Sequence, residues 1–87
     1  MRNKNQYEQV KSAYEAKGNI AYLLDVFGDT IAEREGYKAV DGIEAVHFYI
    51  VHKFKWLPSV VRSMSADDLL FLLTEEMHGW TAPREAL

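Results

Sequence analysis

Two pairs of residues in this sequence have the spacing of metal ligands on a helix: Glu44 with His47, and Glu75 with His78. Residues three positions apart lie on the same face of an α-helix, so a carboxylate and an imidazole can reach one ion together. Di-iron carboxylate bundles combine two such Glu-x-x-His pairs with two further glutamates. The pattern therefore raises the hypothesis of a dinuclear metal site in a helical bundle.

The placement of the two pairs argues against that site. Dinuclear bundles put these pairs on alternate helices, whereas here they fall on consecutive main helices. A core face through Leu69 and Leu73 would also direct Glu75 and His78 toward solvent. Helices of about three turns leave little room to bury two ions and their ligands. We therefore expect no metal, and we interpret His47 as a packed, hydrogen-bonded side chain.

The sequence contains no combination of residues that is typical of an enzyme. Ser59, Ser63 and Ser65 occupy turn and cap positions, where serine has a structural role. His47 and His52 are five residues apart and project from different faces of a helix. There is no cysteine and no glycine-rich loop that could cradle a phosphate. We predict a protein that is not an enzyme and that needs no cofactor.

The composition is that of one small globular domain, residues 1–87, with 48% hydrophobic residues to form a core. The formal net charge is −3, from 10 basic and 13 acidic residues, whereas a dedicated nucleic-acid binder usually carries a basic surplus. The lack of cysteine favours the cytoplasm. No apolar run follows Met1, so we expect no signal peptide. The longest apolar run, residues 69–73, is too short to span a membrane.

Helical periodicity and cap residues divide the chain into five predicted helices, the fourth of which is short and begins at Pro58. They are expected at about residues 6–17, 19–35, 43–55, 59–64 and 66–78. One further helical turn is expected after Pro83. No strand-like alternation competes with this pattern, so the predicted fold class is all-α: a compact bundle of four main helices plus one short helix.

The second of these helices has the clearest amphipathic pattern. Its apolar residues fall within an arc of about 100°. They are Ile20, Leu23, Leu24, Phe27 and Ile31. The acidic residues Asp25, Asp29 and Glu33 are expected on the opposite side, facing solvent.

Two helix starts carry the residues of a capping box. At the third helix, Asp41 and Glu44 have the required spacing, and the Asp41 side chain is expected to accept a bond from the third backbone N–H. At the last main helix, Ser65 and Asp68 form a variant of the same box. These caps predict where both helices begin.

A DNA-binding helix-turn-helix is an alternative interpretation of residues 31–54. Ala32 and Gly36 have the spacing of the small residue and the glycine in such a turn. However, the next helix begins with Ile43, Glu44 and Ala45, whereas a recognition helix offers Arg, Lys, Asn or Gln to the base edges. The start of this helix therefore argues against DNA binding.

Residues 51–62 combine basic and aromatic side chains and contain no acid. The basic residues are His52, Lys53, Lys55 and Arg62, and the aromatic ones are Phe54 and Trp56. This combination could bind a nucleic acid or an acidic protein. The simpler interpretation is a loop between buried helices that its lysines keep hydrated.

Residues 55–73 read KWLPSVVRSMSADDLLFLL: an aromatic residue, a proline-started turn, a valine pair, a cap and a leucine-rich helix. We expect Trp56 to close one end of a helical hairpin in which the valines pack on Leu69 and Leu73. Over residues 53–77, the pattern resembles small bacteriophage and prophage tail proteins, especially the downstream part of tail assembly chaperones. The N-terminal half shows no counterpart of the usual upstream domain of those chaperones.

The resemblance implies a helical adaptor of a virus or prophage that binds the tail tube or tape-measure protein during assembly. The residues expected to bind the partner are Trp56, Leu57, Phe71, Trp80 and Tyr49. Phe71 is included because it points away from the core stripe of its helix, and exposed aromatic residues anchor interfaces. The alternative for each of these residues is that it caps the bundle's own core.

The sequence as a whole predicts a non-enzymatic helical module for protein–protein interaction. The alternatives are a small DNA-binding transcriptional regulator and a phage-encoded inhibitor of a host protein. The expected partner is another protein, with no nucleic acid and no membrane involved. Formation of a homodimer stays open.

Overall fold

The computed structural model describes residues 3–14 and 19–86, and this part of the chain is helical with no strand. The helices are α1 (Lys4–Tyr14), α2 (Asn19–Glu35), α3 (Gly42–Phe54), α4 (Pro58–Arg62), α5 (Ala66–Leu72) and the final 3-10 turn η1 (Arg84–Ala86). The predicted all-α class is confirmed. The predicted C-terminal cap of the first helix, Gly18, lies outside the described residues.

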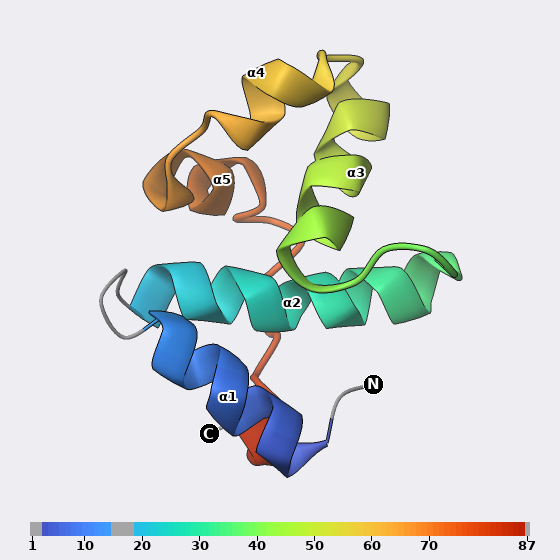
Figure 1. Cartoon of the computed structure of the whole chain (residues 1–87). Helices are drawn as coiled ribbons and strands as arrows, with labels where there is room; N and C mark the ends of the chain where they lie inside the picture. The colour runs from blue at the N-terminus through green and yellow to red at the C-terminus, as the bar shows by residue number, and fades with distance from the viewer. Residues whose placement is uncertain (1–2, 15–18, 87) are drawn as a thin grey trace.

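Helix α2 runs through the middle of the molecule, as Figure 1 shows, with α1 and η1 on one side and α3, α4 and α5 on the other. Two hydrophobic clusters follow from this arrangement. The larger cluster lies between α2, α3, α4 and α5 and includes Phe27, Ile50 and Leu73. The smaller one joins Tyr7 of α1 to Tyr22 of α2 and to the C-terminal turn. Because α2 contributes to both clusters, it is the element on which the others assemble.

The turns around α4 follow the residues that form them. Lys55 adopts a left-handed conformation with φ 61°, and its backbone N–H donates to the Val51 carbonyl, which ends α3. Pro58 stands in the first turn of α4, where its fixed φ fits and no N–H is needed. Ser65 caps α5 as predicted, since its hydroxyl oxygen accepts from the Asp68 N–H at 3.1 Å. The predicted turn after Pro83 is also present, as η1.

Helix α5 ends at Leu72, whereas the sequence predicted a helix that continued to Gly79. The Thr74 hydroxyl donates to the carbonyls of Leu70 and Phe71 at 3.1 and 2.8 Å. Such side-chain bonds to the backbone compete with the regular helical ladder. The chain then continues in turns, one of which is closed by a bond from the Met77 N–H to the Leu73 carbonyl.

The prediction that Asp25 and Asp29 face solvent was wrong. Both are buried, with 5% and 6% of their surface exposed, while Ile20 of the predicted core stripe is 39% exposed. Helix α3 covers the side of α2 that carries the two aspartates. Hydrophobic periodicity could not predict this burial, because the two carboxylates are buried by hydrogen bonding and not by apolar packing.

The two aspartates bind the N-terminus of α3. Asp29 Oδ1 accepts from the Gly42 N–H at 2.9 Å, and Asp25 Oδ1 accepts from the Ile43 N–H at 2.7 Å. These N–H groups have no partner within their own helix, and the positive end of the helix dipole favours a carboxylate there. Asp29 Oδ2 also accepts from the Tyr7 hydroxyl at 3.2 Å, which joins α1 to the same point.

The predicted capping role of Asp41 is therefore corrected. Asp41 is the N-cap residue of α3 and has an extended backbone, but its side chain makes no cap hydrogen bond. Two side chains from another helix accept from the first two N–H groups of α3 instead. The start of α3 is thus fixed by tertiary contact with α2.

A close approach of two glycines accompanies these bonds. A Cβ atom at Gly28 would lie 1.7 Å from the Gly42 carbonyl oxygen. Gly42 itself has φ +54°, and a Cβ there would lie 2.6 Å from Asp25 Oδ1. Gly28 is therefore required because a side chain would not fit, and Gly42 is required both for that reason and for its positive φ.

The substitution Gly28→Ala tests this close approach, because a steric clash and the higher helix propensity of alanine change the stability in opposite directions. In an ordinary helix the substitution would stabilise by about 1 kcal/mol, whereas a clash with rigid backbone should destabilise by about 1–3 kcal/mol or more. We expect lower stability in urea unfolding, with Glu33→Ala in the same helix changing it by less than about 0.5 kcal/mol. Unchanged or higher stability of Gly28→Ala would contradict the close approach.

Asp25→Ala tests the cap itself. Removal of the carboxylate leaves the Ile43 N–H without its acceptor, which should lower the free energy of unfolding by about 1–3 kcal/mol. Asp25→Asn keeps an acceptor oxygen at the same place and should lose less. Equal losses for the two variants in chemical unfolding would argue against a hydrogen-bonded cap.

Candidate protein-binding surface

The turn between α3 and α4, together with the first residues of α4, carries three exposed apolar side chains, Trp56, Leu57 and Val60, and we call this region the α3–α4 corner. Leu57 is 69% exposed, Val60 46% and Trp56 37%. The Trp56 ring stacks on Phe54 with a centroid distance of 4.8 Å. Lys55, with its left-handed conformation, sets the backbone before Trp56, and Pro58, with its ring, sets the backbone after Leu57. The corner is therefore an exposed apolar surface whose backbone conformation is set by these two residues.

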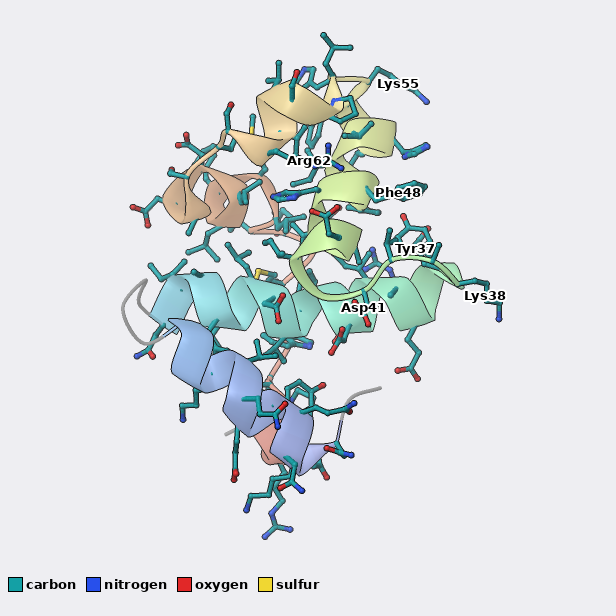
Figure 2. All side chains as sticks on the ribbon, viewed as in Figure 1. Tyr37, Lys38, Asp41, Phe48, Lys55 and Arg62 are labelled. Atoms are coloured by element: carbon teal, nitrogen blue, oxygen red, sulfur yellow. The ribbon has the colours of Figure 1, made fainter. Side chains whose placement is uncertain are left out.

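The segment that forms this corner is basic in sequence, but Lys53 pairs with Glu76 and Arg62 with Glu44, which leaves Lys55 as its basic side chain without an ion pair among the described residues. Residues 45–66 contain three of the ten basic residues of the chain and none of its thirteen acidic residues. Lys55 projects from the end of the corner, as Figure 2 shows. The sequence had indicated this basic character, because residues 51–62 contain no acidic residue. It had not indicated that Val60 belongs to the surface.

An apolar groove lies on the side of α3 next to the corner, and we call it the α3–α4 groove. It encloses about 170 Å³. Its apolar wall is formed by Phe48, Val51 and Pro58, and its rim carries Glu44, His47, His52 and Arg62. Phe48 and Arg62 are labelled in Figure 2. Phe48 is 41% exposed and was not singled out from the sequence.

Phe71 stands apart from this surface, on α5, and is 80% exposed. Asp67 and Asp68 lie one helical turn before it, and both are exposed. Within the described residues, neither carboxylate forms an ion pair. Phe71 is therefore an exposed aromatic side chain in acidic surroundings, the opposite of the corner.

Two of the five residues expected to bind a partner lie inside the bundle's own contacts. Trp80 packs edge-on against Phe27 at 5.0 Å, and its indole N–H donates to the Thr30 hydroxyl at 3.1 Å. Tyr49 donates to Glu76 Oε1 at 3.0 Å. The structure therefore places Trp56, Leu57 and Phe71 at the surface, and it places Trp80 and Tyr49 where they join the C-terminal segment to α2 and α3.

The contact around Glu76 shifts the pKa values of its members. Burial, followed by the hydrogen bond to Glu76, raises the pKa of Tyr49. The hydrogen bond from Lys53 lowers the pKa of Glu76, and the same bond raises the pKa of Lys53. The ionised carboxylate thus accepts from both an ammonium and a hydroxyl group, which holds residue 76 against α3.

The metal-ligand pairs do not form a site. His47 Nδ1 lies 3.4 Å from Glu44 Oε1, and Glu44 also contacts Arg62 at 3.4 Å. Glu75 and His78 are both exposed, as expected, but they lie in the turns beyond α5 and not on the helix that the helical-wheel argument assumed. Within residues 3–14 and 19–86, no three His, Cys, Asp or Glu residues are placed to hold one metal ion.

A larger hollow of about 600 Å³ lies between α2 and the loop that leads into α3. Tyr37, Lys38 and Asp41, labelled in Figure 2, belong to that loop. Asp29 at its wall already accepts from the Gly42 N–H and the Tyr7 hydroxyl. The polar groups of this hollow thus include those that hold α1, α2 and α3 together.

Comparisons of the chain with protein-family models, with curated proteins and with solved structures find no match. The resemblance to tail assembly chaperones therefore stays a prediction. Among the described helices, none is both long and apolar enough to pass through a bilayer.

Glu76→Gln should show the lowered pKa as a change in stability with pH. A carboxyl group whose pKa is lower in the folded state stabilises the fold above its unfolded pKa, near 4.5, and this contribution is lost as the pH falls through the folded value. We expect Glu76→Gln to be less stable than the wild type at pH 7, with the difference shrinking below pH 4.5. The measurement is urea unfolding over a pH series.

Glu75→Gln is the matched control, because Glu75 is exposed and makes none of these bonds. It should remain close to the wild type at every pH. A constant gap between wild type and Glu76→Gln down to low pH would contradict the assigned contact.

Proposed function

We propose that this protein is a non-enzymatic binding module that docks another protein at the α3–α4 corner. The observation that carries the proposal is the presence of three exposed apolar side chains, Trp56, Leu57 and Val60, within the α3–α4 corner. Exposed apolar clusters of this kind mark protein interfaces, and tryptophan is enriched among the residues that dominate binding energy.

The local structure of the corner supports this use. Lys55 and Pro58 set the backbone, and stacking on Phe54 orients the Trp56 ring. A surface that is already ordered loses little conformational entropy when a partner binds. The basic residues around it favour a partner surface that carries acidic groups next to an apolar patch.

The role that we propose is that of a phage or prophage adaptor in tail assembly, acting in the cytoplasm on the tail tube or tape-measure protein. Its support is the resemblance of residues 53–77 to tail assembly chaperones, which includes the turn of the corner. A phage-encoded inhibitor of a host protein would use the same surface, and the identity of the captured partner distinguishes the two roles.

The DNA-binding alternative has less support. A recognition helix must present its first residues to the major groove. The first residues of α3 include Gly42, Ala45 and Val46, all buried, and its leading N–H groups bind Asp25 and Asp29 of α2.

Leu57→Asp tests the proposed surface. An aspartate at this 69% exposed position should leave the fold intact and disrupt an apolar contact. We expect wild-type protein to capture a specific partner from the native host, identified by mass spectrometry, and to bind recombinant tail tube or tape-measure protein. Leu57→Asp should weaken that binding about 30-fold or more.

Ile20→Asp is the control, because Ile20 is also a partly exposed apolar residue but lies on α2, away from the corner. It should bind as the wild type does. Equal binding by wild type and Leu57→Asp would reject the corner as the docking surface. Capture of no protein above background would reject the function.

A further inference from the structure

We propose that the protein self-associates by placing Phe71 of one copy in the α3–α4 groove of another. Phe71 is the most exposed of the large hydrophobic side chains described, at 80%. The groove is an apolar hollow on a different part of the same chain. Neither surface is covered by another part of the described chain.

The sizes of the two surfaces match. The groove encloses about 170 Å³. A dry protein cavity of about 150 Å³ lined by apolar side chains accommodates one benzene molecule. The ring of Phe71 therefore fits the groove, where it would contact Phe48, Val51 and Pro58. Aromatic rings packed in this way gain from ring–ring contact as well as from the loss of hydration.

The charges of the two surfaces are complementary. Asp67 and Asp68 flank Phe71, and their carboxylates have no ion-pair partner within the described residues. The rim of the groove carries Arg62, which is 60% exposed at its side chain, and His52. The Arg62 guanidinium has one contact with a carboxylate, Glu44 at 3.4 Å, and retains further N–H donors.

The charges beside these surfaces also favour one orientation of a second copy of this chain over the others. Two grooves facing each other are both hollow, so neither would be filled, and two corners would place the Lys55 side chains of both copies together. Two α5 surfaces facing each other would place four aspartates together. Contact of α5 with the groove is the pairing that sets opposite charges beside an apolar contact. This contact joins different surfaces, so copies either exchange it reciprocally in a closed dimer or extend it head to tail.

Sedimentation equilibrium of the purified full-length protein, over roughly 10 µM to 1 mM, provides the test. We expect the wild type to form dimers or larger species at low salt, and to do so less at high salt, because the flanking charges are exposed. Phe71→Ser should weaken association about 30-fold or more, and Arg62→Glu about tenfold. Ile20→Ser, a matched loss of an exposed apolar side chain, should leave association unchanged.

Mixing the two variants makes the test specific. Phe71→Ser retains an intact groove, and Arg62→Glu retains an intact Phe71. In a head-to-tail assembly a mixture should therefore form a 1:1 complex at concentrations where each variant alone is monomeric, whereas a closed dimer keeps only one of its two contacts in the mixture. Both substitutions change exposed side chains, so their circular dichroism should match the wild type. Phe71→Gln serves as a second variant if Phe71→Ser unfolds.

Two results would overturn the inference: a wild type that stays monomeric to 1 mM, or association that survives loss of Phe71. Neither of them bears on the α3–α4 corner, because Leu57 lies outside the groove lining. A monomeric protein that still captures a partner through Leu57 would leave the proposed function standing.

Discussion

The arrangement of the bundle depends on one contact, in which two aspartates of α2 hold the first N–H groups of α3. A buried carboxylate is costly unless strong hydrogen bonds compensate for the lost hydration. Here each carboxylate accepts from a backbone N–H at the positive end of a helix, at 2.9 Å for Asp29 and 2.7 Å for Asp25. Such charge-assisted bonds are about twice as strong as neutral ones. They also require the helices to approach so closely that residues 28 and 42 must both be glycine.

The position of the exposed surfaces follows from this contact. Since the N-terminus of α3 is fixed on α2, its C-terminus leads away from α2, and α4 forms at the far end (Figure 1). The turn that joins α3 to α4 is therefore remote from the acidic residues of α2. The return of the chain through α5 then places Asp67 and Asp68 on a separate surface. Because the contact of Asp25 and Asp29 with α3 sets the direction of α3, the basic apolar corner and the acidic surface of α5 lie on different parts of the molecule.

Most elements of this fold could be predicted from the sequence because their signals are local. Gly36, Pro58 and Ser65 end or begin helices through their own backbone or side-chain chemistry, and these boundaries agree with the structure to within a few residues. The all-α class followed from the same signals. The end of α5 was not predicted, because Thr74 reads as an ordinary helical residue until its hydroxyl is seen to bond the preceding turn.

What could not be predicted was decided by tertiary contact. Asp25 and Asp29 lie opposite the apolar stripe of α2, where acidic residues are normally exposed. Their burial depends on the N-terminus of another helix, and no periodicity within α2 records it. The residues expected to bind a partner also fall into those that the sequence predicted correctly as exposed and those that tertiary contact buries. Phe71 was identified because it points away from the core stripe of its helix, and Leu57 because of the resemblance over residues 53–77. Trp80 packs into the core through its contacts with α2, 50 residues away along the chain.

The separation of the two charged apolar surfaces makes the two proposals compatible with each other. The α3–α4 groove and the α3–α4 corner share α4 but use different side chains, since Leu57 and Val60 do not line the groove. Copies joined through Phe71 would keep Leu57 exposed and would display several corners at once. Linked binding sites raise the effective concentration of each site for a partner with repeated subunits. A chain of 87 residues that presents a modest apolar corner would in this way bind a repeating partner surface more tightly than a single corner could.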